Sequence, residues 1–183
     1  MAVWAFLKKH VPGFERSALM STGPHIGVRE TRRIKGEYTL TADDVLAGRE
    51  FPDNIARCAY CVDIHQPDGR GSTLRYINAG RSYGIPYRIL LPQVIEQLLV
   101  AGRCASATHE GAASVRVMGA AMAMGQAAGT AAALSIKLGV TPRNVDIDAL
   151  RGLLRQQGAV LEESDSPGRV DDEGLNVPRD LEV

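Results

Sequence analysis

Residues 97–138, QLLVAGRCASATHEGAASVRVMGAAMAMGQAAGTAAALSIKL, determine the fold that we expect for this chain. The segment opens with an apolar run at 98–102, whose length and composition predict a buried strand. A polar loop at 103–114 follows. Residues 115–138 then predict one long helix, which Gly139 ends as a C′ residue. A strand, a loop and a helix in this order predict a βα unit of an α/β fold.

One face of the predicted helix consists of small residues. Ala121, Gly125, Gly129 and Ala133 are spaced four apart, so they form one row along the helix. Glycine inside a helix costs about 0.5–1 kcal/mol relative to alanine. We therefore expect a sheet or a flat ligand to approach this face closely.

The beginning of the predicted helix is a potential anion-binding site. The first turn of a helix leaves backbone N–H groups unpaired at the positive end of the macrodipole. Arg103 and Arg116 flank that end. The alternative is a plain βα unit with an Ala-rich core helix, and the residues alone do not choose between the two. A membrane span is not expected, because Gln126, Thr130 and the Ala/Gly content make the segment too weakly hydrophobic.

The rest of the chain predicts shorter elements. Thr41 and Asp44 form a helix-initiating capping box, and Asp146 is expected to cap a closing helix. Trp4 and Leu7 are expected to face inward from a short first helix. The predicted elements are helices at 3–9 and 145–157, an extended segment at 26–38, and strands at 56–65, 74–79 and 83–91, with Pro86 marking an edge or a bulge.

Three segments of the sequence resemble a known family. Residues 100–134, VAGRCASATHEGAASVRVMGAAMAMGQAAGTAAAL, resemble the C-terminal flavin-binding segment of the FAD-dependent oxidoreductase family. IGVRETRRIKGEYTLTADDVLAG at 26–48 and YGIPYRILLP at 83–92 resemble the same family in the same order. The resemblance covers residues 12–161. More distantly, the chain is similar to the fumarate reductase and succinate dehydrogenase flavoproteins and to the heterodisulfide reductase-like proteins.

The resemblance also defines what these residues lack. Proteins of this kind hold the FAD pyrophosphate at a G-x-G-x-x-G turn between a strand and a helix, and no such motif occurs in the 183 residues. We therefore expect the C-terminal part of a Rossmann-like FAD-binding flavoprotein, without its N-terminal half. A truncated gene, a mis-called start, or a split enzyme whose partner chain carries that half would each give this pattern. The expected regions are a strand-rich cap or substrate region at 1–88, the C-terminal part of the FAD-binding domain at 89–161, and a disordered acidic tail at 162–183.

The resemblance implies electron or hydride transfer through non-covalently bound FAD. The flavin C2 carbonyl and N1 would face the N-terminus of the helix that starts near Val115. The implied cofactor-binding residues are Gly102, Arg103, Ser114, Arg116, Val117 and Met118. His109 and Glu110, in the loop that would face the ring, are the candidate acid–base residues. Arg88 is the candidate for binding a small-molecule substrate, expected to be a carboxylate.

Two further groups of polar residues have both a structural and a functional interpretation. Residues 29–35 carry Arg29, Arg32, Arg33 and Lys35. They form either a solvated face paired with neighbouring glutamates, or a segment from which one arginine reaches the flavin or a substrate carboxylate. His65 follows a predicted strand and precedes a loop, a common place for functional residues. A surface histidine without a function is the alternative.

Three cysteines, Cys58, Cys61 and Cys104, bear on metal and redox chemistry. A zinc ion or an iron–sulfur cluster needs four ligands, and residues three apart in a strand point to opposite faces. We therefore expect free thiols, no metal site and a reducing, cytoplasmic location. A 4Fe-4S electron-transfer protein is one alternative function. A non-catalytic interaction module, or a remnant, is the other.

Overall composition excludes one class of partner. Lys+Arg and Asp+Glu both number 21, which gives a net charge of zero. A neutral chain without a basic run argues against nucleic acid as a partner.

Overall fold

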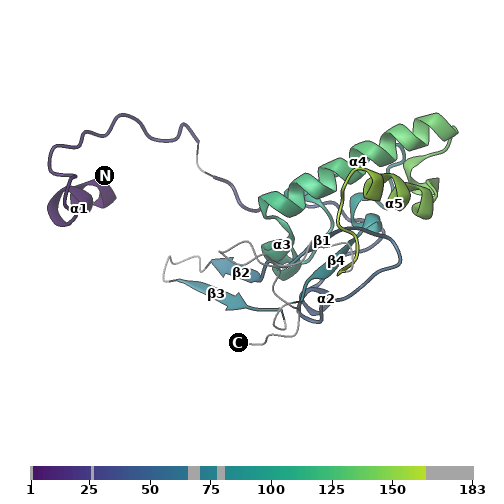
Figure 1. Ribbon diagram of the computed structural model, residues 1–183, viewed down its shortest axis with the longest axis horizontal. Helices are drawn as coiled ribbons and strands as arrows, with labels where there is room; N and C mark the ends of the chain where they lie inside the picture. The colour runs from purple at the N-terminus through teal and green to yellow at the C-terminus, as the bar shows by residue number, and fades with distance from the viewer. Residues whose placement is uncertain (1, 26, 66–70, 78–80, 164–183) are drawn as a thin grey trace.

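Two small antiparallel sheets and several helices make up the fold (Figure 1). The computed structural model describes residues 2–25, 27–65, 71–77 and 81–163. The α-helices among them are α1 (Ala2–His10), α2 (Ala42–Leu46), α3 (His109–Val115), α4 (Met118–Leu138) and α5 (Ile147–Gln156). The strands are β1 (Asn54–Cys58), β2 (Val62–His65), β3 (Ser72–Arg75) and β4 (Tyr83–Pro86). Short 3-10 helices are η1 (Tyr87–Leu90), η2 (Gly102–Cys104) and η3 (Pro142–Asn144).

Each sheet consists of two paired strands. β1 pairs with β4, and β2 pairs with β3, both antiparallel. The β1–β4 register shifts between Asn54 and Ala56, opposite the end of β4 at Pro86. Pro86 therefore lies at a bulge, as predicted, since proline has no N–H to give to the ladder. The predicted strand 83–91 continues after Pro86 as η1, and the predicted strand 56–65 divides into β1 and β2.

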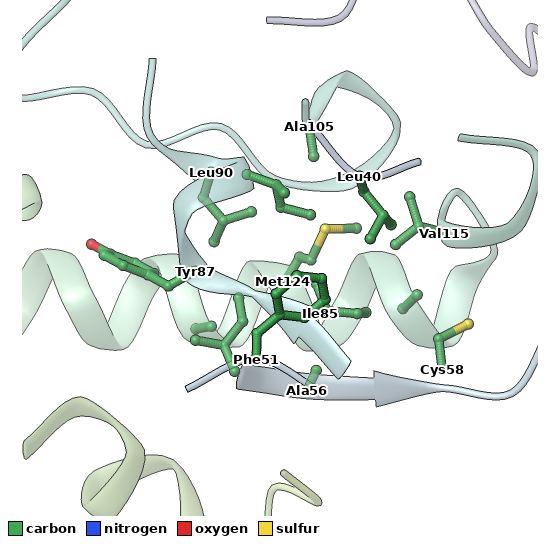
Figure 2. Packing of buried hydrophobic residues seen from close by; sticks show 14 of the residues in the cluster. Leu40, Phe51, Ala56, Cys58, Ile85, Tyr87, Leu90, Ala105, Val115 and Met124 are labelled. Atoms are coloured by element: carbon green, nitrogen blue, oxygen red, sulfur yellow. The ribbon is translucent and has the colours of Figure 1, made fainter. Parts of the chain in front are cut away.

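The hydrophobic core lies between α4 and the β1–β4 sheet. α4 buries one stripe, with Ala120, Met124, Ala127, Ala131 and Leu134 spaced three and four apart. Figure 2 shows Met124 in the middle of the cluster, close to Ile85. Core side chains come from both sides of the predicted boundary at 88/89. The amphipathic helix α5 covers part of α4 through Leu150 and Leu154, and Asp146 caps it as predicted.

The helix predicted at 115–138 is confirmed as α4 from Met118 onward, but the loop predicted at 103–114 contains a separate helix, α3. α3 and α4 meet at an angle of 90°. α3 begins early because the side chain of Thr108 accepts a hydrogen bond from the Gly111 N–H. Val117 has an extended backbone and starts α4 anew. Gly139 has a left-handed conformation and ends α4, as predicted.

The hydropathy of these helices bears on whether they could span a membrane. No single helix among the described residues is long and apolar enough to cross a membrane. The bent pair α3–α4 passes the test of length and composition only when its two helices are taken together.

The strand predicted at 98–102 is absent from the structure. Residues 98–101 have no regular secondary structure, and Gly102 begins η2. The Val100 N–H donates to the Leu90 carbonyl at 2.9 Å. A strand needs a ladder of such bonds with a neighbour, and in the described part of the chain this segment has none.

Helix α1 lies apart from the body of the molecule (Figure 1). None of its residues is buried, so the prediction that Trp4 and Leu7 face a core is wrong for the structure described. Residues 27–35 have no regular secondary structure, and Gly36 forms an isolated bridge with Pro92. Ile26 and the predicted tail from residue 164 onward lie outside the described residues. Glu162 and Glu163, at the start of that tail, contact Arg151 and Arg57.

Candidate functional site

The first turn of α3 brings a histidine against a distant glutamate. Thr108 caps the helix, which places His109 at its first position with its side chain more than half exposed. His109 Nδ1 lies 2.8 Å from Oε2 of Glu30, which reaches over from the extended segment 27–35. Arg33 holds the other oxygen of Glu30. This pair, which we call the His109–Glu30 dyad, fixes the imidazole with Nδ1 toward the carboxylate and leaves Nε2 for other partners.

Glu110, the second predicted acid–base residue, is held in its ionised form. Its own backbone N–H at the helix N-terminus lowers the pKa of its carboxyl group, and the Thr108 hydroxyl, His109 and Arg33 lower the pKa further. A carboxylate in this position accepts hydrogen bonds or protons. It is not a proton donor near neutral pH.

A second polar cluster lies where β2 passes the C-terminal end of α3. Arg29 donates to Nε2 of His65, and Arg116 Nη2 donates to the backbone carbonyl of Asp63 at 3.1 Å. Asp63 Oδ2 accepts from the Tyr60 hydroxyl at 3.2 Å and lies 3.2 Å from His65 Nε2. We call these five residues the arginine–histidine cluster. Ser72 Oγ lies 3.1 Å from His65 Nδ1 and fixes the ring from its other side.

Tyr60 and Asp63 are coupled electrostatically within this cluster. The carboxylate of Asp63 raises the pKa of Tyr60, and the nearby Arg116 guanidinium opposes that rise. The Tyr60 hydroxyl therefore stays protonated and remains a hydrogen-bond donor. Oδ1 of Asp63 is buried and has no hydrogen-bond partner among the described residues.

The His109–Glu30 dyad and the arginine–histidine cluster lie at opposite ends of α3. α3 has seven residues, so its ends lie about 10 Å apart at 1.5 Å per residue. His109 stands at the beginning of α3 and Arg116 just after its end. Arg29 and Glu30 are adjacent in sequence, and each contacts one group. The extended segment 27–35 therefore connects the dyad with the arginine–histidine cluster.

The N-terminus of α4 follows directly after Arg116. Val117 is its N-cap residue and makes no side-chain capping hydrogen bond. Met118 is 83% exposed, and a Cβ added to Gly119 would meet no atom within 4 Å. Gly102, at φ +74°, lies beside the first turns of α4, because a Cβ added to it would come within 3.9 Å of Ala121 Cβ. The helix end is therefore open to a ligand.

Two predicted site residues have structural roles. Ser114 is fully buried, where its hydroxyl donates to the Tyr60 carbonyl at 2.6 Å and lies 2.8 Å from the Tyr83 hydroxyl. It faces the core, so it does not reach a cofactor at the surface. Arg88 is paired with Asp53 through Nε at 3.0 Å and Nη2 at 3.1 Å. Because Asp53 already occupies its guanidinium, the structure does not bring Arg88 together with His109.

The three cysteines are not grouped with one another or with other metal-ligating side chains in the described part of the chain. Cys58, Cys61 and Cys104 are free thiols, and the described residues contain no group of three or more His, Cys, Asp or Glu side chains that would hold a metal ion. The 4Fe-4S alternative therefore has no support from the structure.

An apolar surface extends along α4 from its open end. Met118, Met122, Gly125, Gly129, Ala133 and Ile136 are all exposed and follow a spacing of three or four residues. We call them the open face of α4. A Cβ added to Gly125 or Gly129 would meet no atom within 4 Å. Val94 and Ile95, in the segment that leads to residues 98–101, are exposed as well. Contiguous apolar surface of this kind marks an interaction site.

Comparison with known proteins identifies the family. The pattern described as "FAD dependent oxidoreductase" matches residues 2–154, which is most of the chain. The chain belongs to the FAD-dependent oxidoreductase family. No curated protein and no solved structure matches it. The mixture of helices and small antiparallel sheets is compatible with a domain of this family.

The residues around the start of α4 suit the flavin part of FAD, the cofactor of this family. An uncapped helix N-terminus, the uncrowded Gly119 and the nearby Arg116 provide N–H donors and positive charge beside open space. The exposed Arg103 adds a second guanidinium near Gly102. The chain has no G-x-G-x-x-G sequence to hold the pyrophosphate.

Sequence patterns alone do not reveal several residues of the site. They indicate Glu30 only as a partner for neighbouring arginines, and they do not single out Tyr60 or Asp63. Glu30 and Asp63 are brought to the site by contacts with segments distant in sequence, and Tyr60 joins through its hydrogen bond to Asp63, three residues away. Asp63 is the second residue of β2 and His65 its last, so their side chains lie on one face. This alternation is the one local signal that links them.

Proposed function

We propose that this chain forms the flavin-facing wall of an FAD-dependent oxidoreductase, with the C2 carbonyl and N1 edge of the flavin at the N-terminus of α4. The observation that carries the proposal is the open beginning of α4, a helix of 21 residues whose N-cap residue Val117 provides no side-chain cap. Its first N–H groups and its dipole favour negative charge at that edge. In this arrangement the fold is the C-terminal part of a Rossmann-like FAD-binding protein.

Each of the neighbouring residues has a role in holding the cofactor non-covalently. The backbone N–H groups of Val117 and Met118 donate to the flavin edge, and the Arg116 guanidinium adds positive charge beside it. Gly102 allows the chain to approach the ribityl portion, and Arg103 lies along it. When bound, FAD supplies the electron or hydride transfer.

The His109–Glu30 dyad is the acid–base group of the proposed site. A carboxylate at Nδ1 holds the neutral imidazole with its proton on that nitrogen. Nε2 then accepts a proton from a substrate or returns it. Glu110, the next residue of the same helix turn, stays ionised because its carboxyl pKa is lowered.

A dinucleotide-binding segment from outside these 183 residues completes the proposed enzyme. The open face of α4 is apolar, and its two glycines leave room for a close neighbour. Residues 98–101 have no regular secondary structure and lack a full set of strand hydrogen bonds. A strand and a helix carrying a G-x-G-x-x-G turn would cover both features. They come either from the same polypeptide or from a partner chain.

The proposal is tested by titrating the full 183-residue chain with FAD and following flavin fluorescence. We expect saturable binding that Arg116→Ala weakens at least tenfold, with Arg32→Ala, an exposed arginine without a described partner, as the matched control. Equal loss with both variants would show general electrostatic attraction and contradict the site. If the folded chain does not bind FAD, the titration is repeated with a chain that carries the G-x-G-x-x-G segment. If that longer chain does not bind FAD either, the proposed function is refuted and the alternative of a non-catalytic interaction module is favoured.

A further inference from the structure

Residues 2–22 form a small unit of their own, apart from the body of the molecule (Figure 1). We call this unit the N-terminal arm. Helix α1 and the segment after it line a hollow of about 460 Å³. The apolar lining comes from both parts of the arm and includes Val3, Trp4, Leu7, Phe14, Leu19 and Met20. None of these side chains belongs to the hydrophobic core of the body. The arm therefore gathers its apolar side chains around a hollow of its own.

The apolar side chains of the arm are open to solvent. No residue of the arm is buried. Val3 is 73% exposed, Phe6 is 58% exposed and Met20 is 92% exposed. Val3 and Phe6 are three positions apart in α1, so they lie on the same face of the helix. Apolar surface that gathers in one place without a cover marks an interaction site.

The charged side chains of the arm are mostly basic. The arm carries Lys8, Lys9 and Arg16 but only one carboxylate, Glu15, whereas the whole chain has a net charge of zero. Glu15 accepts hydrogen bonds from a backbone N–H of the arm, at 3.0 and 3.2 Å. The Nζ atom of Lys8 lies 5.0 Å from the centre of the Trp4 ring. The arm is therefore positively charged around its apolar side chains and complements a negatively charged surface.

This combination favours an anionic membrane surface over a protein groove. Segments that lie in the membrane interface carry aromatic and aliphatic side chains next to lysines and arginines. Lys8 and Lys9 occupy the last turn of α1, and their long side chains reach headgroups while apolar neighbours enter the lipid. The apolar side chains come from a helix and from a segment without helix or strand. A deformable lipid layer accommodates both parts, whereas a rigid groove fits one of them.

We propose that the N-terminal arm binds the surface of an anionic lipid bilayer. Val3, Phe6 and Met20 enter the apolar boundary, and Lys8 and Lys9 lie at the lipid phosphates. The contact is attachment to a surface and not a membrane span, since no single helix among the described residues is long and apolar enough to cross. The inference goes beyond the proposed function, because the residues that would hold FAD lie outside the arm.

Trp4 reports on this contact directly, because it lies in the arm and is the one tryptophan of the chain. The full 183-residue chain is titrated with vesicles of phosphatidylcholine that contain about 25% phosphatidylglycerol, and with vesicles of phosphatidylcholine alone. With the anionic vesicles we expect co-sedimentation and a saturable shift of the Trp4 emission to shorter wavelength. Binding to the neutral vesicles should be at least tenfold weaker. High salt should weaken binding to the anionic vesicles, because it screens the lysines.

A pair of charge variants tests the role of the lysines. The double variant Lys8→Glu with Lys9→Glu should weaken binding to the anionic vesicles at least tenfold. Arg32→Glu with Lys137→Glu makes the same change in net charge at exposed positions outside the arm, and it should leave the affinity unchanged. Circular dichroism verifies that each variant is folded. Equal weakening by the two double variants would show attraction by net charge alone and would overturn the proposal.

A pair of apolar variants separates the arm from the open face of α4. Phe6→Ser should weaken vesicle binding at least tenfold, because the phenyl ring no longer enters the lipid. Ile136→Ser removes a side chain that is 83% exposed on the open face of α4, and it should have no effect. Vesicle binding that depends on Ile136 and not on Phe6 would overturn the proposal and assign the lipid contact to α4. If the folded chain binds neither kind of vesicle, or binds both equally, the proposal is also overturned, and a protein partner is favoured for the arm.

Discussion

Nδ1 of His109 lies 2.8 Å from Oε2 of Glu30, although the two residues are far apart in the sequence. The histidine belongs to a capped helix turn, whereas the glutamate belongs to an extended segment without a regular element of its own. Because Arg33 holds the second oxygen of Glu30, the carboxylate has a fixed orientation. The dyad is therefore preorganised before any substrate arrives.

The first prediction concerns the tautomer of His109. In the wild-type chain we expect the neutral imidazole to carry its proton on Nδ1, because Glu30 accepts a hydrogen bond there. Glu30→Ala removes that acceptor, so the Nε2-protonated tautomer should predominate. Long-range ¹H–¹⁵N correlation spectra distinguish the two forms, and His109→Gln assigns the signal. Glu37→Ala is the matched control, since Glu37 pairs with Arg143 and not with a histidine. An unchanged tautomer in Glu30→Ala would contradict the dyad.

The second prediction concerns the glycines of the open face. Gly125→Ala and Gly129→Ala should each stabilise the 183-residue chain by about 0.5–1 kcal/mol, the difference in helix propensity. A new Cβ meets no atom within 4 Å at either position, so nothing offsets that gain. Urea unfolding measures the effect. If a partner segment packs on this face, the same variants should weaken its association, and stability and binding would change in opposite directions.

A third glycine provides the opposite control. A Cβ on Gly111 would lie 2.3 Å from the Leu40 carbonyl oxygen, which belongs to the backbone and has little freedom to move. Gly111→Ala should therefore destabilise the chain despite its position in helix α3. A gain in stability at Gly111, or a loss at Gly125, would refute the packing described for these helices.

Local signals predicted the boundaries of several elements correctly. Thr41 and Asp44 form the expected capping box, Asp146 caps α5, and Gly139 ends α4 with a left-handed conformation. These features depend on residues within a few positions of one another, so a short window of sequence contains the whole interaction. Helix α3 was missed because residues 103–114 were predicted as a polar loop, whereas Thr108 caps a helix that begins inside it.

Roles that depend on long-range partners were not predictable in the same way. Ser114 and Arg88 are polar residues in suitable segments, and only the fold reveals Tyr60 and Asp53 as their partners. Glu30 was not predicted as a site residue because its partner, His109, is distant in sequence. The stretch at 98–102 has the composition of a strand, but composition does not provide a neighbouring strand to pair with.

The third prediction concerns pH and the cap of α2. Asp44 is 3% exposed. Burial alone would raise its pKa, but hydrogen bonds from the Thr41 backbone, Arg49 and Tyr38 outweigh burial and hold the pKa below its ordinary value of 3.8. A lowered pKa in the folded state means that the carboxylate stabilises the fold above the ordinary pKa and loses that effect as the pH falls through the folded value.

The corresponding variant is Asp44→Asn. At neutral pH this substitution should lower the free energy of unfolding by about 1–3 kcal/mol, the usual range for hydrogen bonds lost by a buried polar group. The difference from wild type should shrink as the pH falls below about 4. Urea unfolding at several pH values measures the loss at neutral pH and its decrease in acid. Asp43→Asn, exposed in the same first turn, should cost much less. A difference that grows on acidification would contradict the assigned pKa direction.

The fourth prediction concerns the ion pair between Asp53 and Arg88. Asp53 is 6% exposed and accepts from the Arg88 backbone N–H and from its guanidinium. Asp53→Ala leaves these donors without their acceptor, so we expect a loss of about 1–3 kcal/mol in the free energy of unfolding. Arg88→Leu should also lower stability, because it leaves the carboxylate of Asp53 buried without its cation. Urea unfolding at neutral pH measures both losses, and Arg32→Leu, at an exposed arginine with no partner among the described residues, should leave the stability unchanged. A free energy of unfolding that Asp53→Ala leaves unchanged would contradict the pairing described for Arg88.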